Sequence, residues 1–120
     1  MSGRKNTNQH RLLSGQSMAT DFSSEASNIL FVDNVGLQVK WTGTAIGVIT
    51  VECSNNHDPD THTEGDWYSL TFDPALEQPA GTAGGYLINL NQVPFSWVRL
   101  SYDAGSGSGS MDCWFTSKMA

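Results

Sequence analysis

The sequence predicts an all-β protein that folds as a single antiparallel β-sandwich, jelly-roll-like or immunoglobulin-like, with about seven strands. Three observations predict this class. Apolar and polar residues alternate in several short segments, clusters of Gly, Ser, Thr and Asn separate those segments, and no segment has the periodicity of an amphipathic helix. A chain of 120 residues is long enough for one hydrophobic core. We therefore expect a sandwich domain at residues 28–120, preceded by an extended N-terminal arm at residues 1–27.

The segment 35–56 shows this pattern most clearly. Its first half alternates, and one face of the expected strand carries Leu37, Val39 and Trp41. A period of two indicates a half-buried strand, because successive side chains of a strand point to opposite faces. Residues 48–53 are rich in β-branched side chains, which suit a second strand. Residues 42–47 contain two glycines that suit a turn, so we predict a β-hairpin.

Five further strands are predicted at residues 28–33, 67–72, 86–90, 96–102 and 111–116. In the fourth of these strands, one face carries Val98, Leu100 and Tyr102. In the fifth, one face carries Met111, Cys113 and Phe115. If these faces form the core, then Trp97 and Trp114 point outward. The polar segments between the strands, which contain Gly or Pro, are the predicted loops 54–66, 75–85 and 103–110.

The N-terminal arm is polar and has no periodicity, so it would be disordered on its own. Its first twenty residues hold three basic residues and no acidic one, whereas the rest of the chain is acidic. The residues that we expect to anchor the arm on a neighbouring subunit are Arg4, Lys5, Arg11, Leu12, Leu13 and Phe22. A merely flexible terminus is the alternative. Nucleic acid is a less favoured partner of the arm, because three charges are few.

The chain shows no apolar run long enough to span a bilayer and no pattern of a cleaved signal peptide. We therefore expect synthesis in a host cytoplasm and no membrane contact. Two cysteines, Cys53 and Cys113, lie far apart in the sequence. A disulfide between them would need neighbouring strands. Without a secretory signal, two free and buried thiols are the favoured interpretation.

The loop 54–66 is the first candidate for chemistry, because acidic and histidine residues alternate along it. These residues are His57, Asp58, Asp60, His62, Glu64 and Asp66. Several of their oxygens could face one point, and calcium takes six to eight oxygen ligands. However, the EF-hand pattern is absent, and two histidines without a third fixed ligand are weak evidence for a transition metal. We favour a solvated surface loop and expect no metal or other cofactor.

The sequence offers no catalytic constellation, so we do not expect an enzyme. No G-x-S-x-G elbow is present, and the three histidines lie in the arm or in the acidic loop. The glycine-rich segment 81–85 lacks the lysine of a phosphate-binding loop. A hydrolase built on this scaffold would need a nucleophile and base that these patterns do not supply.

Aromatic residues offer a different kind of site. Four of them, Trp67, Tyr68, Trp97 and Trp114, could form a platform for a sugar ring. Exposed tryptophans mark ligand or protein contacts more often than they mark nothing. We favour core or subunit contacts for them over a sugar platform.

The sequence resembles a recurrent group of small virion proteins of tailed bacteriophages over roughly residues 28–118. The resemblance lies in "VGLQVKWTGTAIGVITVECSNN", "WYSLTFDPAL", "AGTAGGYLINLNQVPFSWVRLSY" and "GSGSGSMDCWFTSK". In that group, a polar N-terminus precedes a strand that ends in W-T-G, and a strand pair of the type I-x-L-N-Q-x-P-F-x-W-x-R-L-x-Y follows. The loop between Asn56 and Trp67 departs from the pattern because it is longer and more acidic. The resemblance implies a β-sandwich structural protein of the particle without catalytic residues.

We therefore expect a non-enzymatic structural protein located in the virion. Within the virion we expect a capsid-associated decoration or cement protein, or a protein of the head vertex or neck. Its partners would be the major capsid protein or other virion subunits, including further copies of itself. Trp97 and Trp114 join the arm residues as expected partner-binding residues. The alternative is a carbohydrate-binding module for host adhesion on the tail or capsid surface.

Overall fold

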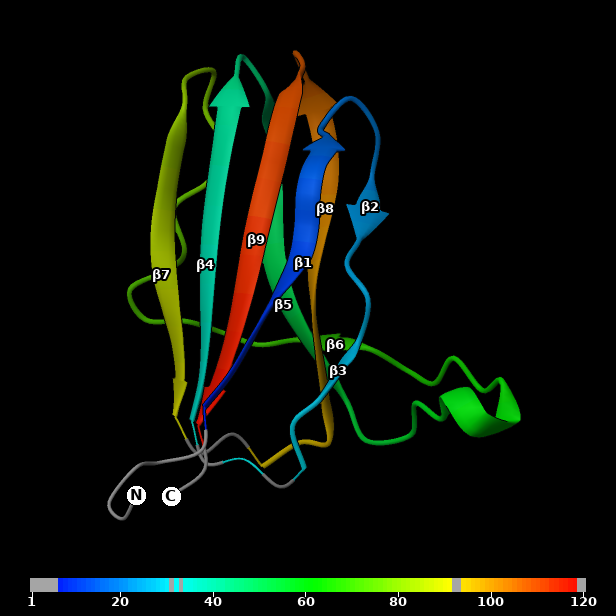
Figure 1. The fold of residues 1–120 in the computed structure, drawn as a ribbon. Helices are drawn as coiled ribbons and strands as arrows, with labels where there is room; N and C mark the ends of the chain where they lie inside the picture. Colours follow the sequence, from blue (N-terminus) through cyan, green and yellow to red (C-terminus); the bar gives the residue numbers. More distant parts are fainter. Residues whose placement is uncertain (1–6, 31, 33, 92–93, 119–120) are drawn as a thin grey trace.

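In the part of the chain that the structure describes, nine strands form two antiparallel sheets that pack face to face (Figure 1). The structure is a computed structural model that describes residues 7–30, 32, 34–91 and 94–118. Sheet A has the strand order β1 (Thr7–Ser17), β9 (Gly109–Lys118), β4 (Asn34–Gly43) and β7 (Gly84–Asn91). Sheet B has the order β2 (Phe22–Ser23), β8 (Trp97–Ser106), β5 (Ile46–Ser54) and β6 (Tyr68–Ser69), and β3 (Ser27–Asn28) also pairs with β8. The short 3₁₀-helix η1 (Pro59–Thr61) lies in the loop after β5.

The strand pairing is nested, with early strands paired to late ones. β1 pairs with β9, both β2 and β3 pair with β8, β4 pairs with β7, and β5 pairs with β6. Sheet A has four strands and sheet B has five, of which β2 and β3 both pair with β8, and two layers wound in this way form a jelly roll. The predicted all-β sandwich is confirmed, and of the two predicted variants the pairing selects the jelly roll.

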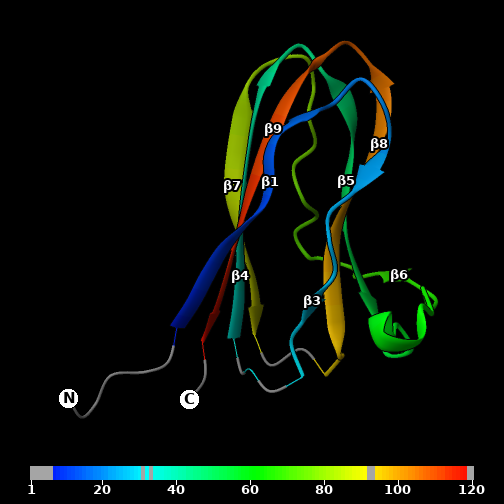
Figure 2. The ribbon, with the colours of Figure 1, turned by 45° about the vertical axis from the view of Figure 1, so that its right-hand side comes forward.

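Figure 2 shows the two sheets from the side. The hydrophobic core fills the space between them. Every second residue of the long strands points into it. These residues include Leu37, Val39, Trp41, Ile49, Val51, Ile88, Leu90, Val98, Leu100, Tyr102, Met111, Cys113 and Phe115. The alternation in the sequence therefore assigned the inner faces of these strands correctly. Trp97 and Trp114 point outward, as predicted, and both are half-buried.

The predicted hairpin over residues 35–53 is wrong. β4 belongs to sheet A and β5 to sheet B, so the chain crosses from one layer to the other between them. Ala45 at this crossing is fully buried and closes the end of the core. The crossing packs against the turn between β8 and β9, where the N–H of Thr44 donates to the carbonyl of Ser108 at 2.7 Å. Alternation identifies the buried face of a strand, but it does not identify the neighbouring strand.

The extended arm is also wrong as far as residues 7–27 are described. β1 pairs with β9 along most of its length, and Leu13 and Met18 are buried in the core of the same chain. β1 lies at the edge of sheet A, and of its residues 9–17 only Leu13 is buried, so the strand shows little apolar periodicity. Its alternation is interrupted by register shifts on both sides of Leu13 and by Gly15, which has a φ of 61°. Arg4 and Lys5 lie outside the described residues.

Two other predicted strands differ from the structure. Of the strand predicted at 28–33, only Asn28 is in a strand, while residues 31 and 33 lie outside the described residues. The strand predicted at 67–72 is reduced to β6. Beyond β6, the N–H of Leu70 still donates to the carbonyl of Val51 at 2.8 Å, so the segment continues beside β5 without regular strand geometry.

At one edge of sheet B, the side-chain amide of Gln78 forms hydrogen bonds with the backbone of β5, as a neighbouring strand would. The amide of Gln78 accepts a hydrogen bond from the N–H of Ile49, and its Nε2 donates to the carbonyl of Ile49 at 3.0 Å. Nearby, the N–H of Gly47 donates to the carbonyl of Pro79 at 3.2 Å. These contacts provide hydrogen-bond partners for backbone N–H and C=O groups of β5 that have no neighbouring strand at this edge.

The opposite edge of sheet B is covered by residues 21–29, which run along β8. The hydroxyl of Ser24 accepts from the N–H of Leu100 at 3.0 Å, and the N–H of Ser24 donates to the carbonyl of Leu100 at 2.8 Å. Asp21 accepts from the N–H of Ala104 at 2.7 Å. Both edges of sheet B are therefore protected.

The two cysteines are free and buried, as predicted. Cys53 lies on β5 and Cys113 on β9, so they belong to different sheets. Burial raises the pKa of the Cys53 thiol to about 11 and that of the Cys113 thiol to about 12. In the described part of the chain, no helix is long and apolar enough to cross a membrane.

We expect the substitution Gln78→Glu to destabilise the fold by about 1–3 kcal/mol, because a carboxylate cannot donate to the Ile49 carbonyl and leaves a backbone group without a partner. The measurement is chemical denaturation at neutral pH. Gln38→Glu, at an exposed glutamine on β4, introduces the same charge and is the control. An equal effect of both substitutions would contradict the role of Gln78.

We expect neither cysteine to react with a disulfide reagent in the native protein at about pH 8, because both thiols are buried and protonated there. In denaturant, both thiols should react at once. The test is to count the cysteine thiols that react with and without denaturant. Rapid reaction of Cys53 or Cys113 in the native state would contradict the burial of that thiol.

Candidate functional site

The outward-pointing tryptophans lie on opposite outer faces of the sandwich. Trp97 is on β8 in sheet B, and Trp114 is on β9 in sheet A. The core separates the two, so no single sugar platform combines them. Each tryptophan is instead partly covered by a basic or histidine side chain, and each outer face has to be considered by itself.

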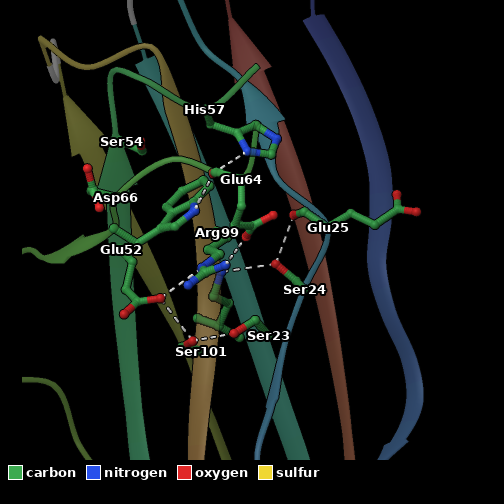
Figure 3. Close-up of polar contacts among 12 residues, drawn as sticks. Ser23, Ser24, Glu25, Glu52, Ser54, His57, Glu64, Asp66, Arg99 and Ser101 are labelled. Carbon is green, nitrogen blue, oxygen red and sulfur yellow. Dashed lines mark hydrogen bonds and ion pairs between the residues drawn. The ribbon is translucent and has the colours of Figure 1, made fainter. Parts of the chain in front are cut away.

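The outer face of sheet B carries a polar cluster around Arg99 (Figure 3). Arg99 points outward because its neighbours Val98 and Leu100 are buried in the core. Its Nε donates to Oε1 of Glu52 at 2.8 Å, and its Nη1 donates to Oε1 of Glu64 at 3.0 Å. The Glu52 oxygen also accepts from the hydroxyl of Ser101 at 3.0 Å. The strands and the acidic loop are thus connected through one guanidinium group.

Aromatic rings complete this Arg99 cluster. The guanidinium carbon lies 4.3 Å from the ring centroid of Trp67, a distance typical of a cation–π contact. The ring of His57 packs against Trp67 and Trp97, with centroid distances of 5.4 and 4.9 Å. His57 Nδ1 donates to the carbonyl of Glu64 at 2.7 Å, which fixes the proton on that nitrogen. The ring of His57 therefore covers part of Trp97 and leaves less of its surface open to a sugar.

The acidic loop is held by its own hydrogen bonds and does not gather its carboxylates at one point. Asn56 accepts from the N–H of Asp66 at 2.8 Å, and its Nδ2 donates to the Asp66 carboxylate at 2.9 Å. Asp58 caps η1 by accepting from the N–H of Asp60 at 3.0 Å. Among the residues that the structure describes, no three His, Cys, Asp or Glu side chains are grouped to hold a metal ion.

The outer face of sheet A carries a second arginine on a tryptophan. The guanidinium carbon of Arg11, on β1, lies 4.6 Å from the ring centroid of Trp114. The same guanidinium forms an ion pair with Asp112, whose Oδ1 also accepts from the N–H of Gly15 at 2.7 Å. These contacts join β1 to β9 through side chains, in addition to the strand pairing. The Gly15 N–H and the Arg11 guanidinium hold the pKa of Asp112 below its usual value.

Beside Trp114, the outer face of sheet A is hollowed into a groove of about 370 Å³. Gly36 on β4 forms its floor, because a glycine leaves the pleated surface bare between neighbouring strands. Its walls are side chains of β7, β4 and β9, chiefly Leu87, Asn89, Gln38, Trp114 and Thr116. We call this hollow with these six residues the outer groove. Leu87 at its rim is 78 % exposed, the highest value among the large exposed hydrophobic residues described.

The predicted partner-binding residues are thus distributed over three environments. Leu13 is in the core, and Leu12 and Phe22 pack partly buried against it, so Leu13 is not available to a partner. Trp97 is partly covered within the Arg99 cluster. Only Arg11 and Trp114 lie together on an open face. The sequence analysis did not identify Gly36 and Leu87 as residues of this face. The signal for an exposed leucine was the alternation of Leu87 with its inward-pointing neighbours Tyr86 and Ile88.

Neither a protein-family model nor a curated protein matches this sequence. Among solved structures, the SPBc2 prophage-derived protein YomS has a TM-score of 0.62 at 9% identity, and the match covers 98% of both chains. A structure of infectious bursal disease virus, Gx strain, has a TM-score of 0.51 at 11% identity over 98% of this chain and 32% of that chain. The VP2 subviral particle of infectious bursal disease virus has a TM-score of 0.51 at 8% identity, over 98% and 33% of the two chains. At these identities the likeness shows a shared fold.

We expect Asp112→Asn to lower the free energy of unfolding at neutral pH by less than about 1 kcal/mol, because the ion pair with Arg11 is partly exposed to solvent. The folded pKa of Asp112 is lowered, so its contribution is present above the unfolded pKa of about 3.9 and is lost as the pH falls through the folded pKa. Urea denaturation at neutral and at acidic pH measures this. The control is Asp103→Asn at an exposed carboxylate, and a difference that persists in acid would contradict the assignment.

Proposed function

We propose that this chain is a non-enzymatic structural protein of a bacteriophage virion, either a capsid-associated decoration or cement protein or a protein of the head vertex or neck. It binds neighbouring subunits by surface complementarity. Its partners are the major capsid protein or other virion subunits. The contact lies on the outer face of sheet A, where the outer groove receives a side chain of the neighbour.

The outer groove is the observation that carries this proposal. It combines a glycine floor with an exposed leucine and a tryptophan on a regular sheet, and an aromatic or aliphatic anchor in such a hollow is typical of protein interfaces. By contrast, the polar groups of the Arg99 cluster bind one another. No nucleophile–base pair lines the groove, so adhesion fits it better than catalysis.

Two further observations support a role in a viral particle. The jelly-roll pairing recurs in a prophage-derived protein and in a subviral particle, although at these identities the likeness concerns the fold. The sequence strings at 35–56, 67–76, 80–102 and 105–118 also resemble small virion proteins of tailed phages. Together they favour a particle protein over the carbohydrate-binding alternative, whose platform of Trp97 and Trp114 is divided between two faces.

The test is to follow the chain in phage particles purified from cells that carry its gene. In a deletion background, the wild-type gene, Gly36→Gln and Val48→Gln are supplied in trans, and the chain is quantified in gradient-purified particles by mass spectrometry. A Cβ added at Gly36 meets only the Thr116 carbonyl oxygen within 4 Å, at 4.0 Å, so we expect glutamine to be accepted by the backbone there and to fill the groove. We expect Gly36→Gln to lower incorporation about tenfold or more, as for the loss of one interface anchor.

Val48→Gln is the matched control, because Val48 is exposed on sheet B and far from the groove. It should be incorporated like the wild type. Absence of the wild-type chain from particles would refute the virion role. Full incorporation of Gly36→Gln would keep the chain in the particle but reject the outer groove as its contact.

A further inference from the structure

The four sheet edges of this protein differ in how they are protected against pairing with another strand. In sheet B, Gln78 covers β5, and residues 21–29 cover β8. In sheet A, β1 is interrupted by two register shifts and by the left-handed Gly15, and it carries Arg11. Bulges, charges and covering segments are the usual devices that keep edges from associating.

The fourth edge, β7, has none of these devices. Among the described residues β7 pairs only with β4, in an unbroken register from Gly84 to Asn91. Its sequence, GGYLINLN, contains no charge and no proline. Leu87, near its centre, is an exposed hydrophobic residue. A regular, uncharged edge of eight residues can accept another strand along about 26 Å.

A knob and a hole lie next to each other on this edge. Leu87 projects from the outer face, and beside it Gly85, on the same face, adjoins a hollow of about 460 Å³ that Gln38 and Lys40 of β4 also line. A second copy of β7 presents the same pair. If two copies meet across a two-fold axis, the leucine of each can enter the hollow of the other. Such self-complementarity is the property that a symmetric dimer interface requires.

The geometry of antiparallel pairing restricts the register. Residues directly opposite each other must point to the same face, so a two-fold axis normal to the sheet passes through one residue position. With the axis at Leu87, the two leucines are opposite each other and are diagonal neighbours of the partner's Gly85. With the axis at Tyr86, each Leu87 is directly opposite Gly85 of the other copy. Neither register brings like charges together, because β7 has none.

We propose that two copies of this chain pair antiparallel through β7 and join their A sheets into one eight-stranded sheet. This dimer does not depend on the proposed virion role. Eight residues from each copy are fewer than the roughly 20–30 per side of a standard interface. The dimer is therefore weak in isolation, with a dissociation constant on the order of 10–100 μM.

Sedimentation velocity of the full chain from about 1 μM to about 1 mM measures this self-association. The variant is Leu87→Lys, which places two lysines opposite or diagonal to each other and blocks the hollow. We expect it to weaken dimerisation about tenfold or more. Since Leu87 is exposed, the variant should fold, and an unchanged unfolding midpoint verifies this.

Val48→Lys is the matched control, because Val48 is also an exposed hydrophobic residue but lies on β5 in sheet B, away from β7 and its hollow. The same charge at that position should leave the association nearly unchanged. For cross-linking, the reference position is Gln38, which pairs with Leu87 one strand further from the edge, so the two Gln38 positions of the dimer are about 14 Å apart, three strand spacings. In a second measurement, a bismaleimide with a reach of about 8 Å should link Leu87→Cys into a covalent dimer but not Gln38→Cys.

A wild-type chain that stays monomeric to about 1 mM would overturn the proposal. Equal association of Leu87→Lys and Val48→Lys would do the same, because the contact would then lie elsewhere. Equal cross-linking of the two cysteine variants would also reject the β7 pairing.

Discussion

The packing of two inner sheet faces against each other is the interaction on which the rest of the structure depends. Each sheet has one apolar face, and neither can be stable until the other covers it. The nested pairing of β1 with β9, β4 with β7 and β5 with β6 brings these faces together from strands distant in the sequence. Because one cluster holds the buried residues of both sheets, the inner surface is committed to the fold. Contacts with other molecules are left to the outer faces and the edges.

The two outer faces differ in what they leave available. On sheet B, Arg99 binds two glutamates and a tryptophan, and this ties the acidic loop to β5 and β8. That face is therefore satisfied internally, and its charged residues stabilise a loop instead of forming a metal site. On sheet A, Arg11 and Asp112 fix β1, while the glycine floor and Leu87 remain open. The open face and the open edge β7 adjoin each other, so one side of the molecule presents both the groove and an unpaired strand.

The residues that could be assigned from sequence are those whose environment is set by their immediate neighbours. Val98, Leu100 and Cys113 were placed inside, and Trp97 and Trp114 outside, because a pleated strand alternates whatever it pairs with. The hairpin prediction failed because the partners of β4 are chosen by contacts with residues more than forty positions away in the sequence. β1 was missed because one ladder to β9 and a buried Leu13 stabilise it, not a periodic apolar face. Likewise, nothing local predicted that His57 would cover part of Trp97.

The sequence by itself determined the all-β class, the inner faces of most strands, including the burial of both cysteines, and the positions of most turns. These properties follow from period-two alternation and from turn residues, which act over a few neighbours. Only the tertiary structure decided the jelly-roll pairing, the inclusion of residues 7–27 in the sandwich, the separation of Trp97 from Trp114 and the one unprotected edge. Strand partners and edges depend on which distant segments bury their faces together, and that choice is made by the whole chain when its core forms.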